Sequence, residues 1–345
     1  MRTDTDRASA RGLRSELRGL GTDYAAPEGR HVLGAMTFGT RSFAALHPDG
    51  HPELGIRTAS PGFDTVQEVW TTDSRPEHGT DHGLAFAHDG EYLYCIGHIP
   101  EFGVYQHHSR SAYESAFRLI DELGYPHIFR MWNFVGAING NNAEGVEIYR
   151  DFVAGRAEAF ASYGDGTGRM PAATGIGMHG TGIGFAFLAC RSGAVRHIEN
   201  HRQTPAYHYP QEYGPKPPSF ARATRLLPGS AEDRGTLFVS GTASILGHET
   251  VHAGDVDQQC KVTLENIAEL IGSANLSRSG LDHGYELTDL DSLKVYVRHP
   301  EHLPIVRAKC AEAFSARAGI AYLHADVCRS DLLVEIEGIV PDPTW

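Results

Sequence analysis

The chain has 345 residues and a formal net charge of −13, with 41% hydrophobic and 21% charged residues. These values are ordinary for a globular protein with a large core, and the acidic balance argues against nucleic acid or an anionic membrane as the main partner. Five dispersed cysteines, none in a Cys-x-x-Cys pair, argue against a disulfide framework or a cysteine-rich zinc site. A polar N-terminus without a signal-peptide core, and no run of about 20 apolar residues, predict a cytoplasmic protein.

Two similar halves follow a first segment with little predicted order. Residues 1–30 are predicted to be an irregular start, and residues 31–80 short strands between Pro and Gly turns. A strand, helix, strand, helix, strand pattern then occurs twice, and apolar residues at i, i+3, i+4 and i+7 define its helices. The first copy has elements at 91–97, 112–123, 128–135, 145–163 and 182–189. The second has them at 236–241, 258–271, 293–298, 303–316 and 332–339.

The regular offset between the copies predicts an internal duplication. Alternating strands and helices predict an α/β (α+β) fold of mixed sheets with helices packed on one face. The connector at 191–232 is rich in Pro, His and Tyr and predicts an ordered loop, because aromatic side chains are costly to leave in water. We expect an N-terminal segment at 1–80, a first unit with the connector at 81–225, and a second unit at 226–345.

Two motifs suggest other chemistries. The segment His248-Glu249-Thr250-Val251-His252 matches the zinc-peptidase pattern His-Glu-x-x-His, which requires a helix. Gly247 and Gly254 leave room for barely two helical turns, so a loop is predicted. Residues 175–180 match the dinucleotide pattern Gly-x-Gly-x-x-Gly but lead into a strand, so a glycine-rich turn is predicted. The twenty histidines show no other metal-ligand spacing, and no metal site is expected.

The second half resembles the RidA (YjgF-type) fold, whose members are trimers with sites between subunits. The segments that carry this resemblance are LFVSGTAS (237–244), QQCKVTLENIAELIGSA (258–274), LKVYVRHPEHLPIVRAKCAEAF (293–314) and DLLVEIEGIV (331–340). The whole chain resembles the chorismatases. The features that add to this resemblance are the stretch from Tyr149 to Arg156, the Tyr/Pro-rich connector and the ending HADVCRSDLLVEIEG. That resemblance implies two RidA-like units in a pseudo-trimeric arrangement within one chain, chorismate as a small-molecule substrate, and no cofactor or metal.

Chorismate carries an enol ether, which is cleaved after protonation of its terminal methylene by a carboxylic acid of raised pKa. The resemblance assigns this role to Glu335, which shares a strand face with Glu337. The other interpretation is that both glutamates face solvent. The resemblance also implies substrate binding by Tyr149, Arg156, Tyr209 and Arg222, with Arg150 and Arg329 as weaker candidates. Arginine suits the two carboxylates of chorismate, although each arginine alone could belong to a surface ion pair.

Gly241 and Cys328 resemble the pair found in the family's 3-hydroxybenzoate-forming subtype. In that subtype Cys328 would be a catalytic residue near the substrate ring, with Gly241 leaving room for it, whereas a small buried packing residue is the alternative for Cys328. The expected reaction converts chorismate to 3-hydroxybenzoate and pyruvate by intramolecular displacement. A hydrolytic chorismatase that forms 3,4-dihydroxycyclohexa-1,5-diene carboxylate, a RidA-like enamine/imine deaminase and a non-catalytic chorismate binder remain open. We expect a monomer.

Overall fold

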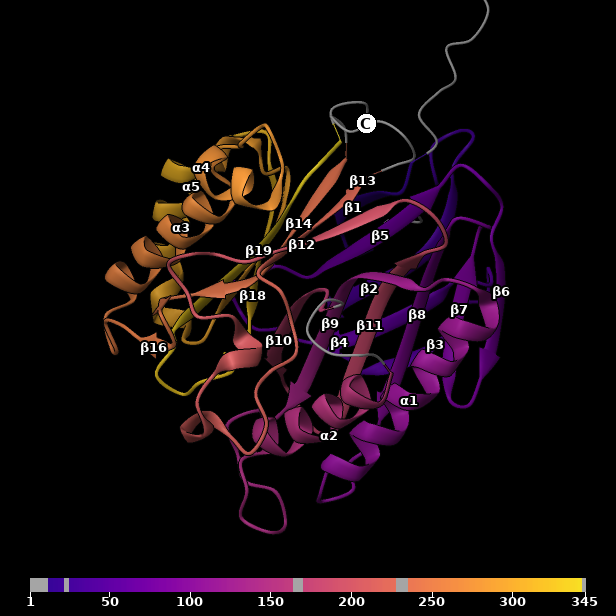
Figure 1. The fold of residues 1–345 in the computed structure, drawn as a ribbon, viewed down its shortest axis with the longest axis horizontal. Coiled ribbons are helices and arrows are strands. Elements are labelled where there is room, and N and C mark those ends of the chain that lie inside the picture. The colour runs from indigo at the N-terminus through magenta and orange to yellow at the C-terminus, as the bar shows by residue number, and fades with distance from the viewer. Residues whose placement is uncertain (1–11, 22–24, 164–169, 228–234, 343–345) are drawn as a thin grey trace, which may run out of the picture.

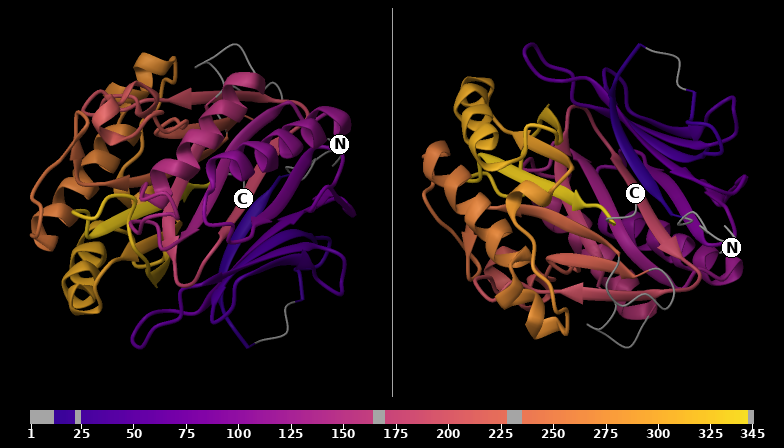
Figure 2. Two further views of the ribbon diagram at one scale, coloured as in Figure 1. Left: turned by 90° about the horizontal axis from the view of Figure 1, so that it is seen from below. Right: turned by 90° about the horizontal axis from the view of Figure 1, so that it is seen from above.

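Three mixed β-sheets follow one another along the chain, in the indigo, magenta and orange-to-yellow parts of the ribbon (Figure 1). The computed structural model describes residues 12–21, 25–163, 170–227 and 235–342. Helices cover the outer faces of the second and third sheets (Figure 2). The predicted fold class, mixed sheets with helices on one face, is therefore confirmed.

The N-terminal sheet has the strand order β1-β5-β2-β4-β3. Its strands are β1 (Arg14–Gly19), β2 (His31–Gly39), β3 (Phe43–Leu46), β4 (Pro52–Arg57) and β5 (Val66–Thr72). The prediction of an irregular start over residues 1–30 is wrong for β1, because this polar segment becomes a strand by pairing along its whole length with β5. Residues 1–11 and 22–24 lie outside the described residues.

The second sheet has the order β10-β9-β11-β8-β7-β6. Its elements are β6 (Glu77–Asp81), β7 (Leu84–His88), β8 (Tyr92–Ile99), α1 (Gln106–Leu123), β9 (His127–Gly136), α2 (Ile148–Tyr163), β10 (Ala172–Met178) and β11 (Ile183–Cys190). All five elements predicted for the first copy are present. The glycine-rich turn predicted at 175–180 is partly wrong, since residues 175–178 belong to β10 and the bend follows at 179–182. Parallel pairing with β9 makes β10 a strand despite its glycines.

The third sheet has the order β12-β13-β14-β19-β17-β18. Its elements are β12 (Ala194–Ile198), η2 (Ala206–His208), η3 (Gln211–Tyr213), β13 (Ala223–Leu227), β14 (Thr236–Ala243), α3 (Val256–Ile271), α4 (Ser273–Leu276), η4 (Ser277–Ser279), η5 (Leu287–Asp289), β17 (Ser292–Val297), η6 (Pro300–His302), α5 (Leu303–Ala313), β18 (Gly319–His324) and β19 (Val334–Val340). The connector predicted as a loop over 191–232 instead contains two strands of this sheet, β12 and β13, while residues 228–232 lie outside the described residues. The His-Glu-x-x-His segment lies in a small hairpin, β15 (Ile245–Leu246) and β16 (Glu249–Thr250), and not in a helix.

The same four-strand core recurs in all three sheets. In chain order, the four strands are β1-β2-β4-β5 in the first sheet, β8-β9-β10-β11 in the second and β14-β17-β18-β19 in the third. In each set the fourth strand lies between the first and the second and is antiparallel to both, and the third strand pairs in parallel with the second. In the N-terminal sheet, β3 replaces a helix between the second and third of these strands. The chain therefore contains three related units, which agrees with the expected pseudo-trimeric arrangement.

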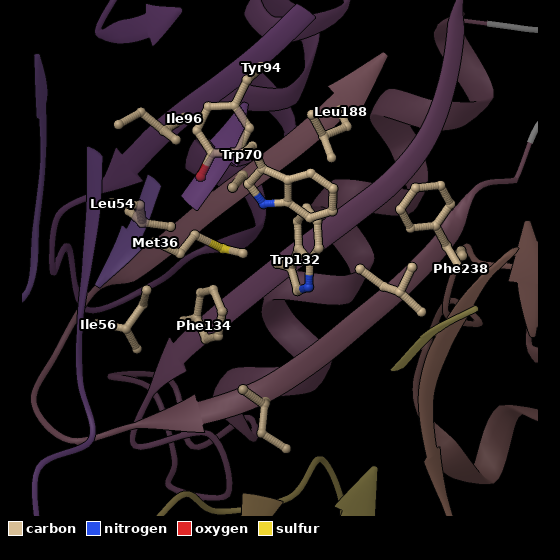
Figure 3. Close-up of a cluster of buried hydrophobic side chains, with 14 of the residues drawn as sticks. Met36, Leu54, Ile56, Trp70, Tyr94, Ile96, Trp132, Phe134, Leu188 and Phe238 are labelled. Carbon is tan, nitrogen blue, oxygen red and sulfur yellow. The ribbon is translucent and has the colours of Figure 1, made fainter. Parts of the chain in front are cut away.

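The inner faces of the three sheets share one hydrophobic core. Met36 and Trp70 come from the first sheet, Trp132 and Phe134 from the second, and Phe238 from the third (Figure 3). The outer faces of the second and third sheets build separate cores with their own helices. Alternate residues of the central strands in the second and third sheets therefore point into different cores, as the period of two requires.

Candidate active site

A cavity of about 310 Å³ lies where the second and third sheets meet. Strands β9 and β10 and helix α2 contribute one wall, and β14, β15 and β19 the other, while the connector and the loop before β19 complete it. All seven residues predicted for the site line this cavity: Tyr149, Arg156, Tyr209, Arg222, Gly241, Cys328 and Glu335. The structure therefore brings together residues that are up to 186 positions apart in the sequence.

Glu335 is the buried acid of the cavity. On β19, Val334 and Ile336 point into the core beneath the helices, whereas Glu335 points inward and is 4% exposed. No described residue donates a hydrogen bond to its carboxyl group. Burial raises the pKa of Glu335 to about 8, and the nearby carboxylate of Glu337 adds to the rise, although Arg130 and Arg222 oppose it. The carboxyl group is therefore protonated at neutral pH and available as a general acid.

Glu337, two residues further along the same face, lies among groups that stabilise its charged form. It accepts hydrogen bonds from Trp132 Nε1 at 2.9 Å, from Arg130 at 2.6 Å and from the Thr174 hydroxyl, and Lys294 lies 2.8 Å away. Burial alone would raise the pKa of Glu337, but Lys294 and Arg130 outweigh it and hold the value at about 2. This carboxylate is permanently charged and structural, so the strand carries one neutral acid and one ionised acid side by side.

Gly241 leaves the space in which the Glu335 carboxyl group lies. It sits where the register of β14 against β19 shifts, and its backbone N–H donates to Thr174 Oγ1 at 3.1 Å. A Cβ atom at this position would stand 2.0 Å from Glu335 Oε1. Since real Cβ contacts do not come this close, any larger residue at 241 would have to move the acid.

Arg222 and Tyr209 form a pair in the connector. Arg222 Nη2 donates to the Tyr209 hydroxyl at 2.7 Å and to the carbonyl of Thr204 at 2.9 Å. Arg156 lies opposite on α2, where its Nη1 donates to the carbonyl of Ser219 at 2.8 Å. The Arg156 bond ties the connector to α2, and the Arg222 bonds join separate parts of the connector, which explains why its aromatic residues are ordered.

Three arginines of the cavity wall each keep a buried N–H without a partner among the described residues. These groups are Arg156 Nε, Arg222 Nε and Arg329 Nη2. A buried donor without an acceptor costs about 1–3 kcal/mol, so native structures rarely leave several in one place. An anionic ligand with carboxylate acceptors would satisfy such donors, and the guanidinium group is well suited to carboxylates.

Tyr149 and Cys328 are both neutral neighbours of the acid. Burial is the largest cause that raises the pKa of the Tyr149 phenol, and the ionised forms of Cys328 and Glu335 would raise it further. Burial likewise raises the pKa of the Cys328 thiol to about 12. A thiol that stays protonated can contact a ring or share a hydrogen bond, but it is a poor nucleophile.

Several further residues line the cavity, some of which sequence reasoning missed. Asn133, Thr174 and Tyr213 were not predicted, while the weaker candidates Arg150 and Arg329 both lie in the wall. Asn133 and Thr174 are polar residues inside strands that are otherwise apolar or glycine-rich, and that interruption is the signal that could have found them. Tyr213 carries no such signal, since its role follows from stacking beneath the Arg329 guanidinium at 3.8 Å.

Comparison with known proteins supplies the family. The family model described as chorismatase FkbO/Hyg5-like, N-terminal, matches residues 68–189. A 3-hydroxybenzoate synthase of Streptomyces hygroscopicus is 53% identical over 316 residues, which cover 91% of this chain and 93% of the relative. The chain belongs to the chorismatase family. A chorismatase of Streptomyces rapamycinicus is 48% identical over 90% of this chain and 92% of its own length.

The structure agrees with this family membership. A crystal structure of a chorismatase superposes with a TM-score of 0.91 at 45% identity, covering 96% of this chain and 98% of that one. The family predicted from the sequence is thereby confirmed, whereas the roles of the individual cavity residues remain predictions. Within the described ranges, no helix is both long and apolar enough to cross a membrane.

Proposed function

We propose that this chorismatase converts chorismate to 3-hydroxybenzoate and pyruvate, with Glu335 as the general acid. The observation that carries the proposal is a buried carboxyl group, neutral at pH 7, in a cavity whose wall holds three incompletely paired guanidinium groups. This combination matches a substrate with two carboxylates and a protonatable enol ether. The 53% identity to a 3-hydroxybenzoate synthase supports the choice of product.

In the first step the Glu335 carboxyl group gives its proton to the terminal methylene carbon of the enolpyruvyl group. The methylene becomes a methyl group, and the positive charge is shared between the adjacent carbon and the ether oxygen. The proton donor needs a pKa near the working pH, which burial provides for Glu335. Arg156 and Arg222 would hold the two carboxylates, so that the methylene faces the acid.

In the second step the ring carbon breaks its bond to the ether oxygen, and pyruvate leaves as a ketone. The neighbouring C4 hydroxyl oxygen forms the new bond to the same carbon, and its proton passes to the Glu335 carboxylate. An arene-oxide-like species results, and its opening with loss of a ring proton gives 3-hydroxybenzoate. Substrate and products balance without water, and the acid returns to its protonated form.

The hydrolytic reaction is the second candidate. It would use the same protonation but admit a water molecule to the ring, giving 3,4-dihydroxycyclohexa-1,5-diene carboxylate. Gly241 and Cys328 support the 3-hydroxybenzoate route, because the family pair they resemble belongs to that subtype. Cys328, a neutral thiol in the cavity wall, would then lie near the ring.

The deciding experiment is incubation of the purified protein with chorismate, followed by chromatography and mass spectrometry of the aromatic fraction and an enzymatic assay of pyruvate. We expect 3-hydroxybenzoate and pyruvate in equal amounts. The dihydroxycyclohexadiene acid would assign the hydrolytic subtype. Release of ammonia from imine substrates without turnover of chorismate would assign a deaminase, and binding without turnover a non-catalytic module.

We also propose a monomer, because the three units close one core within a single chain. Sedimentation velocity at micromolar concentration tests this proposal.

A further inference from the structure

We propose that the β3–β4 hairpin of the N-terminal sheet holds a divalent transition-metal ion through His47, His51 and Glu53. One nitrogen of each imidazole and one carboxylate oxygen lie within 4.8 Å of one another. The spacing His-x-x-x-His-x-Glu carries no recognisable metal signature by itself. The hairpin brings the three residues together. The proposed site therefore departs from the expectation, drawn from the sequence, that the chain holds no metal.

The backbone of the hairpin places these three side chains on one face. His47 and His51 stand opposite each other at the turn, where the His47 N–H donates to the carbonyl of His51 at 2.8 Å. Directly opposite residues of an antiparallel pair have side chains on the same face. Glu53, two residues after His51, pairs with Ala45 and returns to that face. The arrangement thus follows from register and does not depend on chance side-chain rotation.

Neighbouring groups orient two of the three proposed ligands. Glu53 accepts hydrogen bonds from Thr37 and from Gln67 Nε2, and both end on Oε1, which leaves Oε2 for a cation. His47 Nδ1 accepts a hydrogen bond from the Asp49 backbone N–H at 3.3 Å and also lies 3.3 Å from Asp49 Oδ2. When Nδ1 carries the ring proton, the Asp49 carboxylate can accept it, which leaves Nε2 for the metal. Carboxylate-to-histidine contacts and hydrogen-bonded carboxylates of this kind are typical around protein metal sites.

The site opens into a second cavity of about 550 Å³, which includes His47 and His51 in its lining. Its lining shares no residue with that of the active-site cavity. No described helix covers this face of the first sheet, so water can complete the coordination. Arg18 and Arg30 line the same cavity, but Arg18 donates to Gln67 and Arg30 pairs with Asp73 at 2.5 Å.

Two imidazoles and a carboxylate favour zinc, cobalt(II) or nickel(II) over magnesium or calcium, which prefer oxygen ligands. Three protein ligands with an open position resemble the ligand number of exchangeable zinc sites. A metal here would join both ends of the hairpin turn, so its main effect would be on the stability of the N-terminal sheet.

Untagged protein, stripped with a chelator and then dialysed, is titrated with Zn²⁺ by calorimetry and with Co²⁺ by visible absorption. We expect one equivalent to bind, with cobalt d–d bands typical of nitrogen and oxygen ligands, and the midpoint of thermal unfolding to rise with zinc concentration. Asp49→Asn removes a group that contacts a ligand and should weaken zinc binding by roughly 10–100-fold. His51→Ala and Glu53→Gln each remove a ligand and should weaken zinc binding by more than that.

His283→Ala, at an exposed histidine outside the hairpin, is the matched control and should bind zinc like the parent protein. Turnover of chorismate should be the same in the stripped and loaded proteins, so failure of this proposal is distinguishable from failure of the proposed activity. Absence of a saturable equivalent, or equal affinity in His51→Ala and His283→Ala, would overturn the site. Saturable binding of inorganic phosphate but not of zinc would also overturn it, by showing that the cavity selects anions.

Discussion

At the scale of single residues, the site depends on two glutamates that share one strand face but differ in charge. Glu337 is held in its ionised form by hydrogen bonds or an ion pair with Arg130, Lys294 and Trp132. Glu335 faces the cavity, and its carboxyl group accepts no hydrogen bond from a described residue. The ionised neighbour makes ionisation of Glu335 more costly, so the structural acid helps to keep the reactive one protonated. Pairs whose surroundings push their pKa values apart are typical of acid–base sites.

Replacement of the acid separates activity from stability. Glu335→Gln should lower kcat by about 10²–10⁴-fold, because the amide has no acidic proton for the methylene. Folding at neutral pH requires Glu335 to keep a proton that the unfolded chain, with an ordinary value of 4.5, has lost. Its stability contribution is therefore complete below pH 4.5 and is lost as the pH rises toward 8.

The same variant should consequently be more stable than the parent at pH 7, by at most about 3 kcal/mol, and about equal at pH 4.5. Urea denaturation at both pH values measures this difference. Glu312→Gln, at an exposed position of α5, is the control and should change neither quantity. Near-normal turnover in Glu335→Gln would remove this residue from the mechanism.

The pH dependence of the parent enzyme gives a second test of the acid. Since Glu335 must be protonated to act, kcat/KM should stay level through neutral pH and fall tenfold per pH unit above about 8. Bound chorismate is an anion, so the corresponding fall in kcat should occur at still higher pH. Initial rates of pyruvate release between pH 6 and 10 measure both profiles. A decline that begins near pH 5 would show that the acting group has an ordinary carboxyl pKa.

Gly241→Ala tests whether the position of the carboxyl group matters. The added methyl group would stand 2.0 Å from Glu335 Oε1 and must displace it. A displacement of about 1 Å at a reacting group can cost about 100-fold, so kcat should fall while the protein stays folded. Gly319→Ala is the control, since its new Cβ would meet nothing closer than 3.7 Å. Unchanged kcat and product in Gly241→Ala would show that the acid tolerates displacement.

At the scale of elements, the loop between β18 and β19 carries Cys328 and Arg329 and is fixed by Arg298. Four bonds from this guanidinium reach the loop: Nε to the carbonyl of Leu332 at 2.7 Å, Nη1 to Asp326 Oδ1 at 2.6 Å, and Nη2 to the carbonyls of Val327 at 2.9 Å and Arg329 at 2.8 Å. Arg298 directly follows β17, so the end of this strand fixes the position of the loop. We regard it as a positioning residue.

Arg298→Lys should loosen this loop, because an ammonium group cannot reproduce the planar fork of donors. We expect a stability loss of about 1–3 kcal/mol and a fall in kcat/KM of about 10–100-fold. Trypsin should cleave after Arg329 faster than in the parent, which mass spectrometry detects. Arg307→Lys, at an exposed position on α5, should behave like the parent. Equal cleavage and kinetics in the two variants would contradict a positioning role.

The sequence predicted the elements unevenly, for physical reasons. Helices such as 258–271 show a clear apolar period, and the segments at 128–135 and 332–339 are mostly apolar, which predicted strands there. Strands β1 and β10 were missed, since polar or glycine-rich segments become strands only through their partners. Periodicity alone could not locate the cavity. Its residues were found by resemblance, and their convergence depends on how two sheets meet, which no local pattern encodes.

At the scale of the whole molecule, four charged side chains lie where the three sheets meet. In each unit, one residue of the second strand lies opposite one residue of the last strand at this point. The pairs are Met36 with Glu68 in the first unit, Arg130 with Leu188 in the second, and Lys294 with Glu337 in the third. Lys294 Nζ contacts Glu68 at 2.5 Å and Glu337 at 2.8 Å, and Arg130 contacts Glu337 at 2.6 Å. Two basic and two acidic side chains thus join all three units at the centre of the core.

Removal of one of these cations should therefore destabilise the whole fold. Lys294→Met leaves the Glu68 and Glu337 carboxylates without their shared partner, and loss of one member of a buried charge pair costs about 3–5 kcal/mol. Urea unfolding followed by tryptophan fluorescence reports on it, because Trp70 and Trp132 lie in this core. Lys309→Met, which removes a surface pair with Asp257, should cost less than about 1 kcal/mol. Similar losses in both variants would contradict a central role for the cluster.

The matching positions of the units have already diverged. Because Glu337 pairs with Lys294 as Leu188 pairs with Arg130, the position that matches Glu335 is Ala186. Where β14 and β19 set Ala243 opposite Glu335, β8 and β11 set Ile96 opposite Ala186. In an assembly of identical subunits every substitution appears at each interface at once, so a change that helps one site is imposed on all. Joining the units in one chain removes that constraint. One junction could specialise in proton transfer while another became a packed support, and further substitutions at the support need not disturb the chemistry.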